Sequence, residues 1–493
     1  MEHKKTGIPL KGFALLVFSI SLANFMSAID GTIVTVALPT ISEVFNVTPG
    51  TASWIITSYV LVMASCVLIF GKISDIIGFK KVFISGFLIF TLGSCAAGFL
   101  PVFLDSFPVF IGSRVFQAVG ASMMTAIGPA MVTAYIPMEL KGKAMGTVFT
   151  MQAFGAAIGP TIGGVLTQYL SWSWIFFINI PIGIAAILLG KKVIPEIAAK
   201  QWRHGFDRTG AVLIFVGLTS LLFTLSEGQT LGWTSPFILG SLILTILAIG
   251  AFIWCELSVS DPLLELRLFK ERNFFLTNLM VCLLFFCFAG ISYLLPFYLE
   301  YVQGYTPSVV GLIFSSTSIA IMIGGIGAGV LYNRVKGRRI NIAAGIFGVL
   351  GYFLITGIEA DTSLWVLVLG LLLVGIGVGS ILTSASNMIM NSVPKRYQGM
   401  ISSFTSLERF IPMMIGITIF NIIFVLGLSA PSIPGGITTE IFTKMRIEEL
   451  SAGFELAFLV ACIISIIILV LAVLAHLKVH PEYQAADDQK NTS

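Results

Sequence analysis

The chain has 493 residues, of which 56% are hydrophobic and only 11% are charged. Soluble domains are about 25% charged, so this composition excludes the three soluble domains that the length alone would suggest. The net charge of +4, without a dense run of Lys and Arg, also excludes a nucleic-acid-binding protein. We therefore expect most of the chain to lie in a lipid bilayer.

Fourteen apolar stretches follow one another along the chain, and each is long enough for a membrane-spanning helix of about 20 residues. The stretches cover residues 12–38, 52–72, 82–100, 107–130, 143–168, 173–192, 209–228, 234–256, 273–300, 308–332, 340–358, 363–388, 399–428 and 453–477. The first is too long for the core of a signal peptide, so we expect it to be retained. The predicted fold class is an all-α polytopic membrane protein with 14 spans.

The basic residues predict the orientation of these spans, because cytoplasmic loops are enriched in Lys and Arg. With 14 spans, 24 of the 28 basic residues fall on one side of the membrane, and both termini share that side. The opposite side has Lys444 and Arg446, in an outer loop over residues 429–452 that suits either a short surface helix or an unstructured linker. We expect a multi-pass protein of the cell membrane with both termini in the cytoplasm.

Four charged residues lie deep inside predicted spans, namely Asp30, Arg114, Glu408 and Arg409. A charge in the bilayer centre costs roughly 2.5–3.5 kcal/mol on insertion scales, so each is a candidate functional residue. Asp30 and Arg114 lie about eight and about seven residues from the outer ends of their spans, at similar depth for a rise of about 1.5 Å per residue. An ion pair between them, direct or through water, is compatible with these depths.

Several strings resemble the fourteen-helix drug:proton antiporters of the major facilitator superfamily, the EmrB/QacA type. Asp30-Gly-Thr-Ile-Val-Thr-Val-Ala-Leu-Pro39 is similar to the signature of the first helix, although Thr35 replaces the usual Asn. Gly71-Lys-Ile-Ser-Asp-Ile-Ile-Gly-Phe-Lys-Lys81 resembles the superfamily's loop motif, but Ile76 and Phe79 stand at usual Arg positions. The order and spacing of these strings extend over nearly the whole chain.

Further strings in the same order extend the resemblance. Arg114-Val-Phe-Gln-Ala-Val-Gly120 resembles the motif with a buried arginine, and Gly155-Ala-Ala-Ile-Gly-Pro-Thr-Ile-Gly-Gly164 resembles the antiporter motif. Trp172-Ser-Trp-Ile-Phe-Phe-Ile-Asn-Ile-Pro181 resembles a third family string, with Ser173 in place of Arg. The resemblance implies two six-helix bundles, residues 1–192 and 273–493, with two additional helices in 193–272 between them.

The resemblance and the buried charges together predict the site residues. Proton coupling is assigned to Asp30, Arg114 and Glu408; the alternative for Asp30 and Arg114 is a static pair that aligns two helices. Glu408 either binds a cationic substrate or a second proton, or it faces water or neutralises Arg409. The predicted substrate cavity comprises Asn24, Gln117, Gln152, Asn278, Asn387, Glu408 and Arg409.

Two further groups are assigned to conformational change. The resemblance implies a latch between the bundles at the loop residues Gly71, Asp75, Gly78, Lys80 and Lys81; the alternative is that Asp75 is a solvated loop residue that caps a turn. In the fifth span, the small residues favour close helix packing and the proline predicts a bend. The resemblance implies that this bend closes one access path. The small residues and the proline are Gly155, Gly159, Pro160, Gly163 and Gly164.

The sequence carries no signature of an enzyme. It lacks a phosphate-binding Gly-x-x-x-x-Gly-Lys-Ser/Thr loop, a metal-ligand cluster and a nucleophile–base arrangement, so we expect no catalytic residue, no metal and no cofactor. The predicted function is a proton-coupled exporter of small amphipathic or cationic drugs, acting as a monomer on a small-molecule substrate and protons in the bilayer. The alternatives are an exporter of a specific metabolite, amino acid or lipid, and a proton–substrate symporter.

Overall fold

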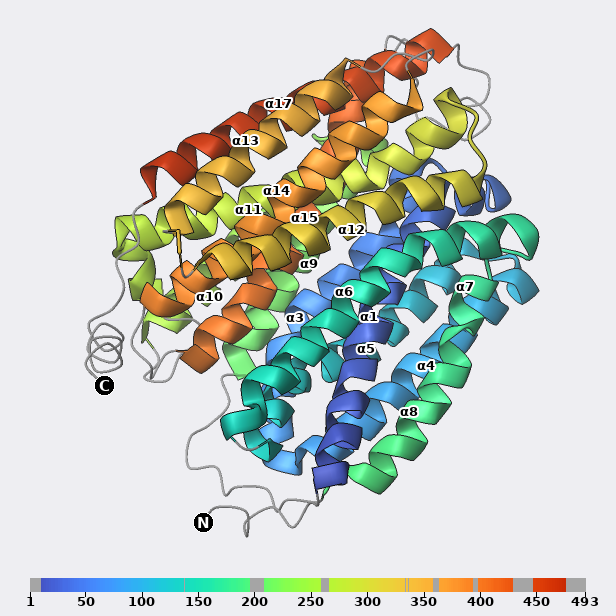
Figure 1. Cartoon of the computed structure of the whole chain (residues 1–493). Coiled ribbons are helices and arrows are strands. Elements are labelled where there is room, and N and C mark those ends of the chain that lie inside the picture. The colour runs from blue at the N-terminus through green and yellow to red at the C-terminus, as the bar shows by residue number, and fades with distance from the viewer. Residues whose placement is uncertain are drawn as a thin grey trace. The chain divides into compact units, whose positions relative to one another are not determined.

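The structure is a computed structural model that describes residues 10–136, 138–195, 208–258, 266–332, 334–335, 337–357, 363–392, 398–428 and 447–475. Within these ranges the regular secondary structure is helical (Figure 1). Lys444 and Arg446 of the outer loop, for which either a short surface helix or an unstructured linker is predicted, lie outside the described residues.

The helices of the first half coincide with the first eight predicted spans, and two short helices accompany them. They are α1 (Leu10–Val44), α2 (Pro49–Ala52), α3 (Trp54–Ile77), α4 (Phe79–Leu104), α5 (Phe107–Tyr135), α6 (Met138–Tyr169), α7 (Trp174–Phe177), α8 (Asn179–Val193), α9 (Arg208–Leu231) and α10 (Pro236–Ser258). The apolar runs thus predicted the helices well, and the true helices extend a few residues further at most ends.

The second half shows the same agreement. A 3-10 turn η1 (Leu266–Lys270) precedes α11 (Arg272–Phe297), which continues into a π-helical turn η2 (Tyr298–Val302). The remaining helices are α12 (Pro307–Tyr332), α13 (Gly337–Thr356), α14 (Leu364–Ser392), α15 (Gln398–Gly427) and α17 (Ile447–Leu474).

Thirteen of the described helical segments are long and apolar enough to cross a membrane. The long helix α5 is not among them, and it carries the buried polar residues Arg114 and Gln117. Its 29 residues, at about 1.5 Å each, nevertheless exceed the roughly 30 Å of a bilayer core. The all-helical polytopic fold is confirmed, and the exact count of 14 spans stays a prediction.

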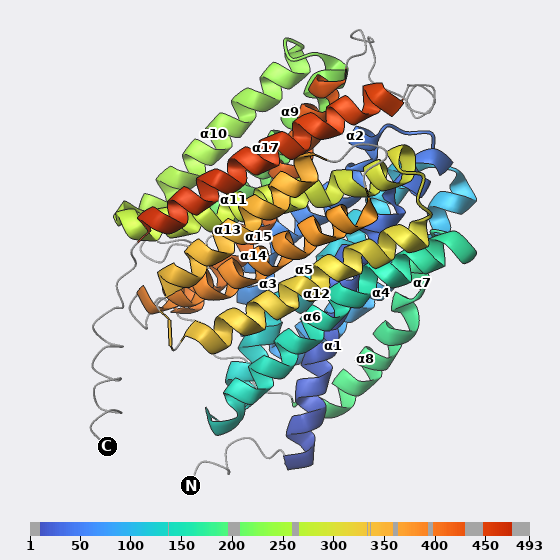
Figure 2. The ribbon, with the colours of Figure 1, turned by 45° about the horizontal axis from the view of Figure 1, so that its top comes forward.

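The chain forms two compact units. The first comprises residues 1–211 together with 305–315, the first turns of α12; the second comprises 212–304 and 316–493. The predicted division into 1–192, 193–272 and 273–493 stays a prediction. In the second unit, α13 packs on α14 and on α17, and Figure 2 shows these helices side by side.

Glycines set the helix spacing in the first unit. A Cβ atom built on Gly93 of α4 would lie 2.6 Å from Cα of Gln117, and one on Gly120 of α5 would lie 2.3 Å from the backbone nitrogen of Phe90. Such approaches are open only to glycine, and close contact through small residues is the usual way that membrane helices associate. This spacing brings the polar side chains of α4 and α5 within hydrogen-bond reach of α1.

Candidate functional site

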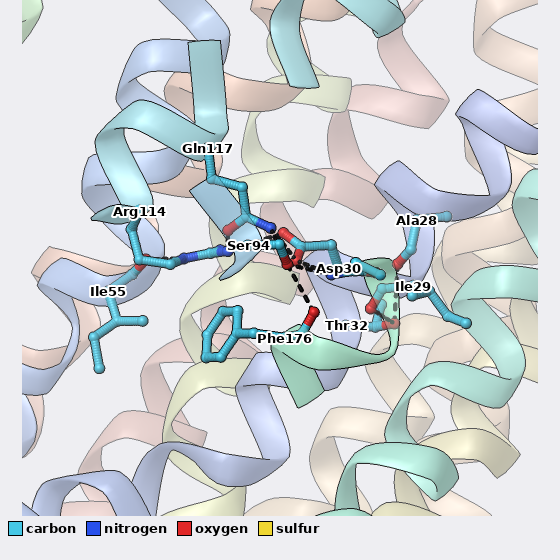
Figure 3. A network of polar contacts seen from close by, with 10 residues as sticks. Ala28, Ile29, Asp30, Thr32, Ile55, Ser94, Arg114, Gln117 and Phe176 are labelled. Carbon is cyan, nitrogen blue, oxygen red and sulfur yellow. Dashed lines mark hydrogen bonds and ion pairs between the residues drawn. The ribbon is translucent and has the colours of Figure 1, made fainter. Parts of the chain in front are cut away.

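The centre of the first unit holds a buried carboxylate, Asp30 of α1, which has no exposed surface. Arg114 of α5 donates from Nη1 to Asp30 Oδ2 at 3.0 Å, and both side chains of this ion pair are almost fully buried (Figure 3). The direct ion pair that the depths of the two residues allowed is therefore present. A buried pair of this kind persists only when further hydrogen bonds satisfy its remaining polar atoms.

A glutamine one helical turn after the arginine supplies some of those bonds. Gln117 donates from Nε2 to Asp30 Oδ1 at 2.8 Å and to Ser94 Oγ at 3.2 Å, and its Oε1 accepts from Arg114 Nη1. Residues three apart on a helix lie on the same face. The Arg-Val-Phe-Gln spacing thus places both donors on the face of α5 that points at α1.

The third and sixth spans complete the network. Asn179, the first residue of α8, donates from Nδ2 to Asp30 Oδ1 at 3.1 Å and to Ser94 Oγ at 3.0 Å. Ser94 of α4 in turn donates to the backbone carbonyl of Phe176 in α7 at 2.9 Å. Helices α1, α4, α5, α7 and α8 therefore meet at one polar junction.

Aromatic rings enclose the guanidinium group of Arg114. The ring centre of Tyr59 in α3 lies 4.2 Å from its Cζ, and that of Phe176 lies 5.5 Å away. Its Nε also donates to the backbone carbonyl of Ile55 at 3.4 Å. Cation–π contacts with desolvated groups are worth about 2 kcal/mol, so these rings hold the arginine in place while the carboxylate accepts its hydrogen bond.

The hydrogen bonds around Asp30 favour its ionised form. In the described hydrogen bonds to Asp30, Arg114, Gln117 and Asn179 each approach it with an N–H donor. A carboxylate is an acceptor only, whereas a protonated carboxyl group needs an acceptor for its own O–H. The geometry therefore fits ionised Asp30, and protonation of Asp30 requires its neighbours to rearrange.

The second unit contains a different buried acid, Glu408 of α15, which is 4% exposed. Its Oε1 is buried and has no hydrogen-bond partner among the described residues. Cys282 of α11 lies within electrostatic reach of it. The neighbouring Arg409 instead places its guanidinium 5.9 Å from the ring centre of Phe285.

A second buried polar atom without a described partner lies in α11. Asn278 donates from Nδ2 to the carbonyl of Phe274 in its own helix at 2.7 Å, whereas its Oδ1 is buried without a described partner. Helices α11 and α15 pack closely, with Gly416 of α15 on the backbone of Phe286 and Phe420 on Gly290.

The other predicted cavity residues are not brought to one place by described contacts. Asn24 donates to the carbonyl of Ile20 in its own helix, and the exposed Asn387 donates likewise to Thr383. Gln152 is half-buried in α6. Gln117 belongs to the Asp30 network. A shared substrate cavity for these residues stays a prediction.

The predicted latch loop is a tight connection. Gly78, with φ of +93°, is the single residue between the end of α3 and the start of α4, a conformation that favours glycine. Lys80 and Lys81 lie in the first turn of α4, and Gly71 lies within α3. Asp75 is in the last turns of α3, but its side chain lies outside the described part of the structure.

The glycines of the antiporter-like string face two different helices. A Cβ on Gly155, Gly159 or Gly163 would lie 2.7 Å or less from atoms of α1, and one on Gly164 would lie 2.2 Å from the carbonyl oxygen of Pro307 in α12. Close packing, one of the two predicted roles, is present. Helix α6 is continuous through Pro160, and the conformational role of the bend stays a prediction.

Next to these glycines, α6 and the first turns of α12 share polar contacts within the first unit. Thr161 and Ser315 form a hydroxyl–hydroxyl hydrogen bond of 2.6 Å, and the Gln168 side chain accepts from the backbone N–H of Ser308 at 3.2 Å. The carbonyl of Pro160 faces Gly311 closely. This contact, hereafter the α6–α12 contact, comprises residues 160–168 and 307–315.

Sequence reasoning missed two members of the Asp30 network, Tyr59 and Ser94. Asn179 was recognised in the Trp-Ser-Trp-Ile-Phe-Phe-Ile-Asn string and as a polar residue inside its span that is a candidate for the central cavity, but it was not assigned to Asp30. Tyr59 and Ser94 carry no sequence signal, since isolated hydroxyl groups in apolar helices are common.

Comparison with known proteins agrees with this architecture. The family model described as Major Facilitator Superfamily matches residues 20–417. The chain is 32% identical over 419 residues to the riboflavin transporter RibZ of Clostridioides difficile, with 84% of this chain and 89% of that protein covered. It is 33% identical over 418 residues to the multidrug resistance protein Stp of Mycobacterium tuberculosis, covering 84% and 76%. A D-xylose–proton symporter structure superposes with a TM-score of 0.64 at 12% identity, covering 93% of this chain and 97% of that one, which shows a shared fold.

Proposed function

This chain belongs to the Major Facilitator Superfamily, and we propose that it is a proton-coupled exporter of the fourteen-helix drug:proton antiporter type. It exchanges protons for small amphipathic or cationic molecules by alternating access, as a monomer in the cell membrane with both termini in the cytoplasm. The name of its relative Stp, a multidrug resistance protein, supports the substrate class.

The observation that carries the proposal is the set of donors around Asp30. Three N–H groups stabilise the ionised carboxylate, so proton binding removes attractive contacts and favours a different arrangement of α1, α5 and α8. Proton binding and helix rearrangement are thereby coupled, which is what an antiporter needs. A static ion pair that only aligns two helices would not couple protonation to helix rearrangement.

Glu408 is assigned to the substrate. A buried carboxylate oxygen without a partner is costly, and an organic cation would satisfy it. The aromatic ring of Phe285, which already faces a guanidinium, is the kind of surface that favours cations. Glu408 is therefore the proposed recognition residue of the second unit, and Asn278 of the packed helix α11 is a further polar group of the predicted cavity.

The proton gradient supplies enough energy for this task. One proton moving through about 100 mV yields about 2.3 kcal/mol, and one pH unit yields about 1.4 kcal/mol more. Their sum supports a several-hundred-fold gradient of a neutral substrate.

The test uses purified protein in lipid vesicles with an imposed pH gradient and ethidium as the probe. We expect ethidium accumulation against its gradient and its loss when an ionophore collapses the pH and electrical gradients. Accumulation that persists after the collapse would contradict proton coupling.

A second candidate function rests on the similarity to the riboflavin transporter RibZ, namely transport of one flavin-like metabolite. Competition separates the two. If ethidium and tetraphenylphosphonium displace each other and riboflavin does not, the drug exporter is supported. Saturable riboflavin transport that is insensitive to both cations would favour the metabolite transporter, and transport in the direction of proton entry would favour a symporter.

A further inference from the structure

The amide of Asn179 occupies an unusual position in the Asp30 network. Its Nδ2 makes both of its described hydrogen bonds, to Asp30 Oδ1 and to Ser94 Oγ. Its Oδ1 is fully buried and has no hydrogen-bond partner among the described residues. Buried polar atoms without partners are rare and call for an explanation.

The alternative orientation of the same amide supplies that explanation. A half-turn about the last side-chain bond exchanges Oδ1 and Nδ2. Towards an ionised carboxylate the amide must present Nδ2, as the structure shows. Towards a protonated carboxyl group at the same 3.1 Å separation, the amide must present Oδ1, because the O–H needs an acceptor.

The other two partners of Asp30 are poor acceptors. Arg114 carries only donors. Gln117 has its Oε1 engaged by Arg114 and its Nε2 shared between Asp30 and Ser94, so reversing its amide would place Nε2 against the guanidinium. Asn179 and the Tyr59 hydroxyl each have an unengaged acceptor beside Asp30, and of the two Asn179 is the one that also bonds Ser94.

Reversal of the Asn179 amide has a consequence for Ser94. In the described arrangement Ser94 accepts from Asn179 and donates to the carbonyl of Phe176 at 2.9 Å. When Oδ1 replaces Nδ2 beside Ser94, the serine hydroxyl turns its proton from Phe176 to Asn179. The carbonyl of Phe176 then loses this donor, at the interruption that Ile178 makes between α7 and α8.

We propose that Asn179 is a positioning residue that reverses its amide when Asp30 binds a proton and, through Ser94, releases the Phe176 carbonyl at the α7–α8 interruption. No covalent bond other than the O–H bond of Asp30 changes. The inference rests on the proposed function, since it requires Asp30 to carry the proton, and it adds how that proton reaches the backbone of the sixth span.

The surroundings of Asp30 leave few other charged or titratable groups to consider. Among the described contacts, Arg114 of α5 and Tyr59 of α3 are the titratable residues that face it. Helices α4, α7 and α8 contribute a hydroxyl, a carbonyl and an amide to the network. Helix α6 meets α1 through glycines.

The test combines transport with infrared difference spectra between low and high pH, on protein carrying 13C-labelled asparagine. The wild type is expected to show a carboxylic C=O band that Asp30→Asn removes, and an asparagine C=O shift that Asn179→Leu removes. The matched control is Asn341→Leu, a buried asparagine of α13 whose Oδ1 also lacks a described partner and whose Nδ2 contacts Met388 Sδ. We expect the control to leave both pH-dependent bands in place.

In vesicles, Asn179→Leu is expected to lower proton-driven ethidium transport by about tenfold or more, the effect of one hydrogen bond to a charged group. Ethidium exchange at equal pH on both sides should fall less than proton-driven transport does. Ser94→Ala is a smaller change, and it should keep the carboxylic C=O band of Asp30 but lose proton-driven transport. This variant provides the test if Asn179→Leu does not fold.

The outcomes separate the two proposals. If Asp30→Asn abolishes both the carboxylic band and coupling, but Asn179→Leu and Ser94→Ala keep wild-type coupling and pH profiles, the role of Asn179 is refuted and the proposed function stands. If Asp30→Asn itself retains proton-driven transport, both are refuted.

Discussion

The α6–α12 contact yields a quantitative prediction for Gly164→Ala. A Cβ at this position would lie 2.2 Å from the carbonyl oxygen of Pro307 and 2.9 Å from Cα of Ser308, whereas ordinary contacts begin at 3.4 Å. The helices must therefore separate by roughly 1.2 Å, the difference between 3.4 Å and 2.2 Å, or the contact must open. Overpacking of this kind costs about 1–3 kcal/mol, which shifts an equilibrium about 5- to 150-fold.

The contact also supplies its own reporter, because the hydroxyls of Thr161 and Ser315 are 2.6 Å apart. In a chain whose six native cysteines are replaced, Thr161→Cys with Ser315→Cys should form a disulfide on mild oxidation. Adding Gly164→Ala should lower the rate of cross-linking at least about fivefold. The matched control is Gly146→Ala on the same helix, where a Cβ meets nothing within 4 Å and the rate should not change.

Both measurements are made in the same vesicles used for transport. We expect Gly164→Ala to slow ethidium transport in proportion to the loss of cross-linking, because the altered contact disfavours one state of the cycle. If Gly164→Ala cross-links and transports at the same rates as Gly146→Ala, the added Cβ does not destabilise the α6–α12 contact, and the predicted overpacking cost is refuted.

Three other predictions each concern one local feature of the structure. Tyr59→Leu should destabilise the folded protein by about 2 kcal/mol by removing the cation–π contact with Arg114, while Tyr59→Phe should be close to wild type. Thermal unfolding in detergent measures both variants, and an equal loss of stability in the two would contradict the contact. Gly120→Ala should lower the unfolding temperature more than Gly112→Ala, because its Cβ would meet Phe90 at 2.3 Å and that of Gly112 meets nothing within 4 Å. Glu408→Gln should weaken ethidium transport about tenfold or more and leave a neutral substrate within about twofold, and equal effects on both would remove Glu408 from cation recognition.

Much of the fold could be predicted because bilayer thickness imposes a length and an apolar composition on each span. The helix with the weakest apolar signal, α5, is weakened by the same Arg114 and Gln117 that serve the site. The two short helices, α2 and α7, were not predicted, since each is four residues long and lies within or beside a longer apolar run. A helix break of one residue does not change the mean hydropathy of an apolar run, so the run does not reveal it.

The candidate site was predictable only in part. Asp30 and Arg114 were visible because charge is rare in apolar stretches, and their similar depth allowed the pairing that the structure shows. The hydrogen-bond partners Ser94 and Asn179 come from helices whose rotation and distance depend on glycine contacts such as Gly93 with Gln117. Sequence periodicity gives neither the rotation of a helix about its axis nor its distance from its neighbours, so these hydrogen-bond partners become visible only in the structure.

Proton transfer by Asp30 is the central claim, and Asp30→Asn tests it most directly when net transport and exchange are measured side by side. The substitution keeps the size of the side chain but removes the carboxylate, and the unpaired Arg114 makes a folding control necessary; substrate exchange at equal pH serves as that control. We predict that Asp30→Asn vesicles exchange labelled ethidium but no longer accumulate it when a pH gradient is imposed. Accumulation at the wild-type level by Asp30→Asn would contradict the account.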